Sequence, residues 1–99
     1  MYNIYSPVEI KTQLLPVFEE YGVKRAILFG SYAKGSADEK SDVDILVDSG
    51  LRGLSFMALC EKIRRTLGIE IDLLDVAHID RNSRIENEIN ATGVLIHEK

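Results

Sequence analysis

The sequence predicts a single α/β (α+β) domain in which about four strands alternate with helices. The chain has 99 residues, of which 45% are hydrophobic, enough for one compact core and too few for a second domain of ordinary size. Four short apolar runs are bounded by glycine or polar residues, and segments with apolar residues at helical spacing lie before and between them. No repeat or low-complexity tract interrupts this order. We therefore expect residues 1–99 to form one domain.

The first helix is expected to begin after Ser6, which can cap it. Pro7 suits the first helical position, and Glu9 is placed to complete a capping box. Apolar residues then follow at near-helical spacing until Gly22, which predicts the end of the helix. Pro16 falls inside this pattern, so it should kink the helix or divide it in two.

Two strands and a loop are expected next. Residues 26–29 form a short apolar run stopped by Gly30, which indicates a buried strand. Small and polar residues at 35–40 predict a loop. Residues 42–48 alternate apolar and acidic side chains, as in a strand, so Asp42 and Asp44 should share one face.

The second half of the chain repeats the alternation of helix and strand. Residues 54–67 carry an apolar stripe with charged residues largely opposite, and Gly68 is a suitable end for this helix. Residues 69–76 read as a strand whose Glu70 and Asp72 point to the same side.

A last helix and strand complete the pattern. Ser83 and Glu86 are spaced as in a capping box, and Gly93 predicts the end of the helix that they begin. Residues 94–97 then predict a short terminal strand.

Composition narrows the function classes. A formal net charge of -4 with 28% charged residues argues against binding a nucleic-acid backbone directly. No apolar run approaches the roughly 20 residues needed to span a bilayer, and no secretory leader is visible, so we expect a cytoplasmic protein without a membrane partner. The single cysteine, Cys60, is expected to be a buried thiol. His78 and His97 lack the spacing of metal ligands and should serve packing or surface roles.

A phosphate-binding turn is expected where the first strand ends. Gly30 lets the backbone approach a bulky anion closely, the following residues offer N–H groups, and the Ser31 hydroxyl adds a donor. A loop of ten residues then leads to the second strand. These features predict that Gly30 and Ser31 hold a nucleotide phosphate.

The second strand adds two carboxylates to this turn. Asp42 and Asp44 on one face can bind magnesium together with phosphate oxygens, and a pair of ions can assist an in-line displacement. Asp72 is the expected third carboxylate from a neighbouring strand, with Glu70 as the alternative. The less favoured alternative is a Gly-Ser turn and an acidic strand edge that only discourages aggregation.

Residues 30–35 (Gly-Ser-Tyr-Ala-Lys-Gly) and 41–47 (Ser-Asp-Val-Asp-Ile-Leu-Val) resemble the signature of the minimal nucleotidyltransferases of the DNA polymerase beta superfamily. With Ile-Asp-Leu-Leu at 71–74, the resemblance extends over most of the chain. The chain is similar to the MntA-type antitoxins of HEPN/MNT toxin–antitoxin pairs. It implies a mixed-sheet, palm-like domain with helices mainly on one face.

The resemblance also implies a reaction. ATP would be the donor and Mg²⁺ the cofactor, with two ions expected at Asp42, Asp44 and Asp72. Asp72 would also help to activate the acceptor hydroxyl, and Gly30 and Ser31 would hold the triphosphate. The acceptor in such pairs is often a tyrosine of the HEPN ribonuclease partner, which AMP silences, and homo- or hetero-oligomers are possible.

One departure from the signature and two alternatives accompany this interpretation. Many relatives carry arginine where this chain has Tyr32 and Lys34, so less positive charge is expected near the phosphates. Arg81 and Arg84 are expected at an exposed helix start. The chain could instead neutralise its partner by contact, as a catalytically silent nucleotide-binding module, or transfer the nucleotide to a small molecule.

Overall fold

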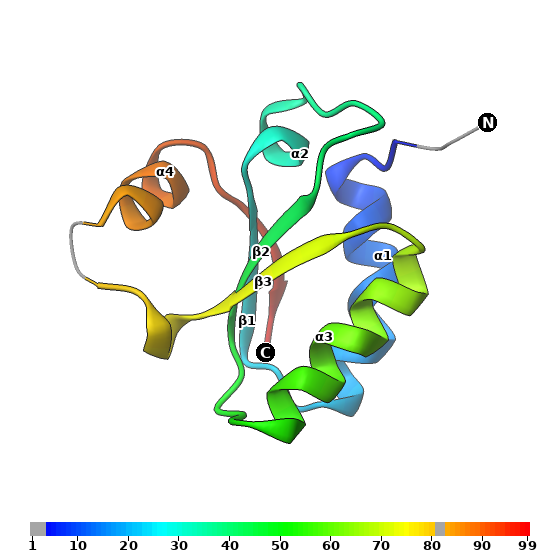
Figure 1. Cartoon of the computed structure of the whole chain (residues 1–99), viewed down its shortest axis with the longest axis vertical. Coiled ribbons are helices and arrows are strands. Elements are labelled where there is room, and N and C mark those ends of the chain that lie inside the picture. The colour runs from blue at the N-terminus through cyan, green and yellow to red at the C-terminus, as the bar shows by residue number, and fades with distance from the viewer. Residues whose placement is uncertain (1–3, 81–82) are drawn as a thin grey trace.

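The computed structural model describes residues 4–80 and 83–99, which form a four-stranded sheet with helices on both sides (Figure 1). In chain order the elements are α1 (Pro7–Glu20), β1 (Arg25–Phe29), α2 (Ser31–Lys34), β2 (Val43–Asp48), α3 (Leu54–Leu67), β3 (Ile71–Asp75), the 3₁₀ helix η1 (Val76–His78), α4 (Arg84–Thr92) and β4 (Val94–Glu98).

The sheet is mixed and has the strand order β3-β2-β1-β4. Strand β1 pairs antiparallel with both β2 and β4, whereas β2 and β3 are parallel. A parallel pair needs a long crossover, and α3 supplies it between β2 and β3. The start of β2 therefore lies beside the start of β3.

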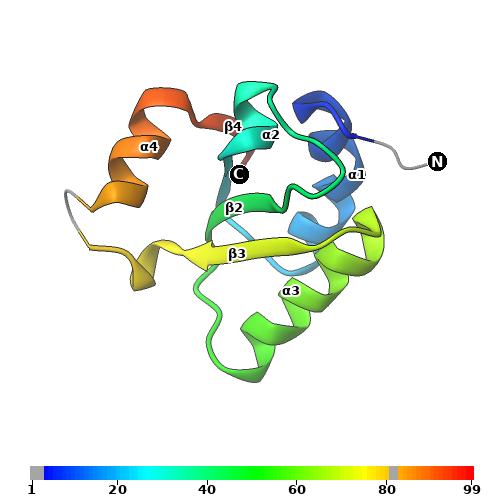
Figure 2. The same ribbon diagram turned by 45° about the horizontal axis from the view of Figure 1, so that its top comes forward.

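Helices α1 and α3 pack against one face of the sheet, and α4 lies on the opposite side (Figures 1 and 2). The expected mixed sheet with helices mainly on one face is thus confirmed. The core lies between α1, α3 and the sheet, and its fully buried side chains include Ile10, Leu14, Phe18, Leu28, Ile45, Leu59, Ile63 and Ile96. Within the described residues, no helix is both long enough and apolar enough to cross a bilayer.

The capping box of α1 forms as predicted. The backbone N–H of Glu9 donates to Ser6 Oγ at 3.2 Å, and the N–H of Ser6 donates to Glu9 Oε1 at 2.9 Å. Pro16 does not divide the helix, which is one continuous element. Pro16 lies on the exposed side, where water can bond the carbonyl that the missing N–H leaves free, while Leu14 and Phe18 hold the other side in the core.

The later boundaries follow the sequence signals closely. Helix α3 has the expected limits and ends at Gly68 in a left-handed conformation, and Ser83 Oγ caps α4 by accepting from the N–H of Glu86. Strand β3 begins at Ile71, two residues later than expected. Cys60 is half-buried against the core rather than fully enclosed, and burial raises the pKa of its thiol.

A buried polar network secures the far ends of β2 and β3. Asp75 is only 3% exposed, and its Oδ2 accepts from the Ser49 hydroxyl at 2.5 Å and the Ser49 N–H at 3.2 Å. Its Oδ1 accepts from the N–H of Ala77 at 3.0 Å. Burial alone would raise the pKa of this carboxyl, but the hydrogen bonds outweigh it and hold the pKa below its usual range. Asp75 is thus a structural carboxylate that joins the end of β3 to the residue following β2.

Candidate functional site

The chain turns sharply at the end of β1, where Gly30 has φ 74° and ψ -155°. Only glycine adopts this conformation readily. The helix α2 starts directly afterwards, so the ten residues expected to be a loop begin with a short helix. The first hydrogen bonds of this turn run from the N–H groups of Ala33 and Lys34 to the Gly30 carbonyl, at 3.2 and 3.1 Å. The N–H groups of Ser31 and Tyr32 precede them and have no acceptor within the helix.

Gly30 is also the point at which the turn meets the second strand. Phe29 pairs with Asp44 across the β1–β2 ladder, which brings the Asp44 carboxylate against the Gly30 backbone. A Cβ atom at position 30 would overlap Asp44 Oδ2. The missing side chain therefore leaves the space that the carboxylate occupies.

The parallel pairing of β2 and β3 places Asp72 directly opposite Asp44. Neighbouring strands lie about 4.8 Å apart, so the two residues are next to each other on the sheet. Asp42 precedes β2 and is exposed, as is Asp72, while Asp44 is partly buried. Glu70 lies before β3, its side chain 74% exposed, and its Oε1 is 3.9 Å from Arg64 Nη1. The register therefore puts Asp72, rather than Glu70, beside Asp44.

These carboxylates act electrostatically on one another. The pKa of Asp44 is raised to about 6, first by burial and then by the negative charges of Asp72, Asp42 and Glu88. In the described part of the chain, no three His, Cys, Asp or Glu side chains already form a metal-binding group. The residues thus make an open acidic rim rather than a closed cage.

An ion pair at this rim was not predicted from the sequence. Lys34 Nζ, at the end of α2, lies 3.5 Å from Glu88 Oε1 in α4. The positions are far apart in the chain, and no local motif links them.

Tyr32 in α2 is 4% exposed, and its pKa is raised by burial and then by Tyr5, Asp38 and Asp42.

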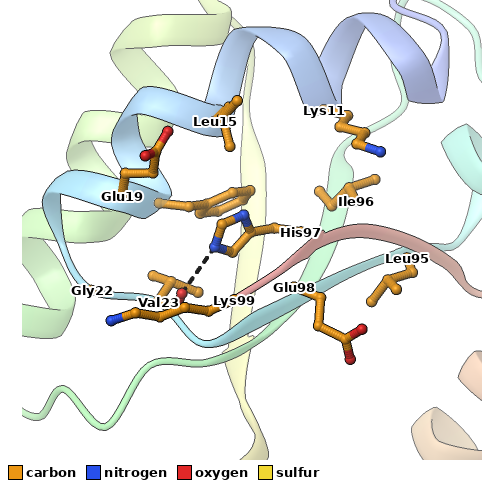
Figure 3. Close-up of a pocket in the computed structure, with 11 residues that line it drawn as sticks. Lys11, Leu15, Glu19, Gly22, Val23, Leu95, Ile96, His97, Glu98 and Lys99 are labelled. Carbon is orange, nitrogen blue, oxygen red and sulfur yellow. Dashed lines mark hydrogen bonds between the residues drawn. The ribbon is translucent and has the colours of Figure 1, made fainter.

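The histidines lie away from this rim and make packing contacts. His97 Nε2 is 3.0 Å from the Val23 carbonyl oxygen, beside a cavity of about 570 Å³ between α1 and β4 (Figure 3). The His78 ring contacts Phe56 edge-on at 5.8 Å. Arg84 is exposed at the start of α4, as expected, and Arg81 lies outside the described residues.

Comparison with known proteins agrees with this geometry. The family described as polymerase beta nucleotidyltransferase matches residues 12–99. This chain belongs to that family. It is 41% identical over 85 residues to a Methanocaldococcus jannaschii protein provisionally named a protein adenylyltransferase, covering 81% of this nucleotidyltransferase and 90% of the relative.

Two further comparisons are with a second relative and with a solved structure. The protein adenylyltransferase MntA of Thermococcus cleftensis is 45% identical over 60 residues, which cover 57% of this chain and 59% of that protein. A crystal structure of a toxin–antitoxin with AMP-PNP superposes with a TM-score of 0.76, covering 90% of this chain and 73% of that one. At 20% identity, the latter shows the shared fold. The resemblance to minimal nucleotidyltransferases is confirmed.

Proposed function

We propose that this nucleotidyltransferase is a magnesium-dependent protein adenylyltransferase. It transfers AMP from ATP to a tyrosine hydroxyl of a HEPN-domain toxin and so acts as an antitoxin. The observation that carries the proposal is the close contact of the Gly30 backbone with the Asp44 carboxylate, next to Asp72. It brings the turn proposed to bind phosphate beside two carboxylates. The names of the relatives and the toxin–antitoxin neighbour support the choice of acceptor.

The acidic rim fits magnesium by its chemistry. Its donors are all carboxylate oxygens, and Mg²⁺ is usually held by one or two carboxylates together with substrate phosphates and water, so an open rim suffices. Burial and then the neighbouring negative charges of Asp72, Asp42 and Glu88 raise the pKa of Asp44, and a bound cation would offset the contribution of those charges. Asp42, Asp44 and Asp72 would hold the metal ions, of which two are expected. When bound, the ions supply charge neutralisation at the reacting phosphates.

The protein's own groups bind and orient the reactants. The N–H groups of Ser31 and Tyr32, which as the first residues of α2 have no acceptor within the helix, and the Ser31 hydroxyl donate to phosphate oxygens of ATP. The Asp72 carboxylate accepts the proton of the acceptor hydroxyl, whose oxygen forms a bond to the α-phosphorus while the bond to pyrophosphate breaks. Asp42 and Asp72 are exposed, so a hydroxyl on another protein can approach the rim from solvent.

The test is AMP transfer by the purified protein. The protein is incubated with ATP, Mg²⁺ and a co-expressed HEPN partner, and the partner is analysed by intact-mass and peptide mass spectrometry. The inactive variant is Asp42→Ala/Asp44→Ala, and Asp48→Ala is the matched control because it removes an aspartate from the other end of β2. We expect AMP on a partner tyrosine with the wild type and the control only. An inhibited but unmodified partner would establish a contact inhibitor, and a partner neither modified nor bound would point to a small-molecule acceptor.

A further inference from the structure

An ion pair joins α2 and α4 at the rim of the site. Lys34 Nζ lies 3.5 Å from Glu88 Oε1, and the two side chains are 47% and 32% exposed. The other ion pairs found among residues 4–80 and 83–99 all involve the C-terminal half of α3: Arg64–Glu61, Arg64–Glu70 and Arg65–Glu61. The Lys34–Glu88 pair differs from these in joining α2 to α4, and the charge of Glu88 acts on Asp44.

Lys34 is well placed to reach an anion on the Gly30 turn. It is the last residue of α2, and helical side chains lean toward the N-terminus, over the preceding turn. That preceding turn contains Gly30 and Ser31, and the Lys34 N–H is itself bonded to the Gly30 carbonyl at 3.1 Å. The flexible lysine stem lets the ammonium group move between nearby partners.

Glu88 reaches the same region from the other side. Its negative charge is among the causes that raise the pKa of Asp44, whose carboxylate fills the space beside Gly30. Helix α4 thus brings a further negative group to the rim, and Lys34 is its paired cation. Phosphates at the Gly30 turn would lie within the reach of Lys34 and would compete with Glu88 for it.

We propose that Glu88 holds Lys34 in the nucleotide-free protein and releases it to the phosphates of bound ATP. This rests on the proposed function, in which ATP binds at Gly30 and Ser31. A triphosphate carries more negative charge than one carboxylate, and a solvent-exposed ion pair is weak enough to be exchanged. Lys34 is then a nucleotide-binding residue, and Glu88 is a positioning residue that lowers nucleotide affinity by competing for it.

The exchange gives a signed prediction for affinity. Glu88→Gln removes the competitor, so ATP with Mg²⁺ should bind about two- to fivefold more tightly, the range set by an exposed ion pair. Lys34→Met should weaken binding. In the Lys34→Met protein, Glu88→Gln should change affinity little, because the residue for which it competes is gone.

The experiment is a double-mutant cycle measured by isothermal titration calorimetry with AMP-PNP and Mg²⁺. The proteins are the wild type, Glu88→Gln, Lys34→Met, the double variant and Glu86→Gln, which makes the same charge change on the same helix. Thermal denaturation establishes that each protein is folded. A gain in affinity from Glu88→Gln that depends on Lys34, with no gain from Glu86→Gln, supports the exchange.

Two results would overturn it. An equal gain in both backgrounds would mean that Glu88 simply repels the phosphates, and no gain in either would mean that the pair does not oppose binding. Both leave the proposed function standing, since the wild type still binds nucleotide. A folded wild type that binds no nucleotide would overturn the proposed function, and this inference with it.

Discussion

Replacing Gly30 by alanine tests whether the site depends on the close approach of turn and carboxylate. Alanine at φ 74° and ψ -155° is strained, and its Cβ would overlap Asp44 Oδ2. Either the turn or the carboxylate must move. We therefore expect Gly30→Ala to lose both stability and AMP transfer, because Gly30 and Asp44 cannot keep their positions together.

The expected loss of folding free energy is the sum of two strain energies less one entropic gain. A non-glycine residue in this backbone region costs about 1–3 kcal/mol, and turning Asp44 away from its rotamer costs about 0.5–1.5 kcal/mol. The lower entropy of alanine in the unfolded chain returns about 0.4–1 kcal/mol. The net loss is about 2 kcal/mol, which corresponds to a fall in Tm of about 8–16 °C for a domain of this size.

The matched control is Gly35→Ala. Gly35 also has a positive φ, 77°, but no heavy atom lies within 4 Å of a Cβ placed there. It should lose less than about 1 kcal/mol and keep its activity. Urea denaturation of both variants, with Gly30→Ala also made in the Asp44→Ala protein, separates the two strains. Equal losses at positions 30 and 35, or the same loss with and without the Asp44 carboxylate, would refute the close-approach explanation.

Three other substitutions probe the charges and the cap. Asp44 has a pKa of about 6 in the folded protein, above its value of about 3.9 in unfolded chains, so ionising it opposes folding. The free energy of unfolding of the wild type should therefore fall as the pH is raised from about 4 to about 6. In EDTA at pH 7, Asp44→Asn should raise the free energy of unfolding, measured by urea denaturation, by at most about 3 kcal/mol, and this gain should vanish below pH 4. Added Mg²⁺ should stabilise only the wild type. Asp75→Asn should lower the free energy of unfolding by about 2 kcal/mol at neutral pH. The difference from the wild type should shrink as the pH falls below the lowered pKa of Asp75, where the wild-type carboxylate is itself protonated. The folded variant should retain AMP transfer. Ser6→Ala should lower the free energy of unfolding by about 1 kcal/mol, and an unchanged value would show that the capping box contributes nothing.

Much of the fold was predictable because its signals are local. The caps at Ser6 and Ser83 and the stop at Gly68 involve residues a few positions apart, so the chain itself displays them. The apolar run at 26–29 and the alternation at 42–48 identified β1 and β2 in the same way. Helix α2 escaped detection because it is one turn long, too short to show a helical repeat of apolar residues, and its N-cap, Gly30, offers no side chain to cap it.

The residues of the candidate site are visible in the sequence, but the contacts between them are not. The spacing of Gly30, Asp42 and Asp44 is visible in one segment, and strand alternation suggested Asp72. The contact of Lys34 with Glu88 depends on how α4 returns over the sheet, which no local pattern encodes. Asp75 looked like any acidic strand residue, because its burial depends on the loop at Ser49.

The parallel pairing of β2 and β3 has a consequence for the nascent protein. Gly30 and Asp44 meet through the antiparallel β1–β2 pair, which closes over a short stretch of chain. Asp72 arrives only after α3 has been synthesised and has packed, because the crossover must be complete before β3 can pair. A growing chain that has emerged only as far as β2 therefore carries the Gly30 turn, Asp42 and Asp44 without Asp72. Under the proposed function, an arrested ribosome–nascent-chain series should therefore show no AMP transfer from any chain in which β3 has not yet left the exit tunnel.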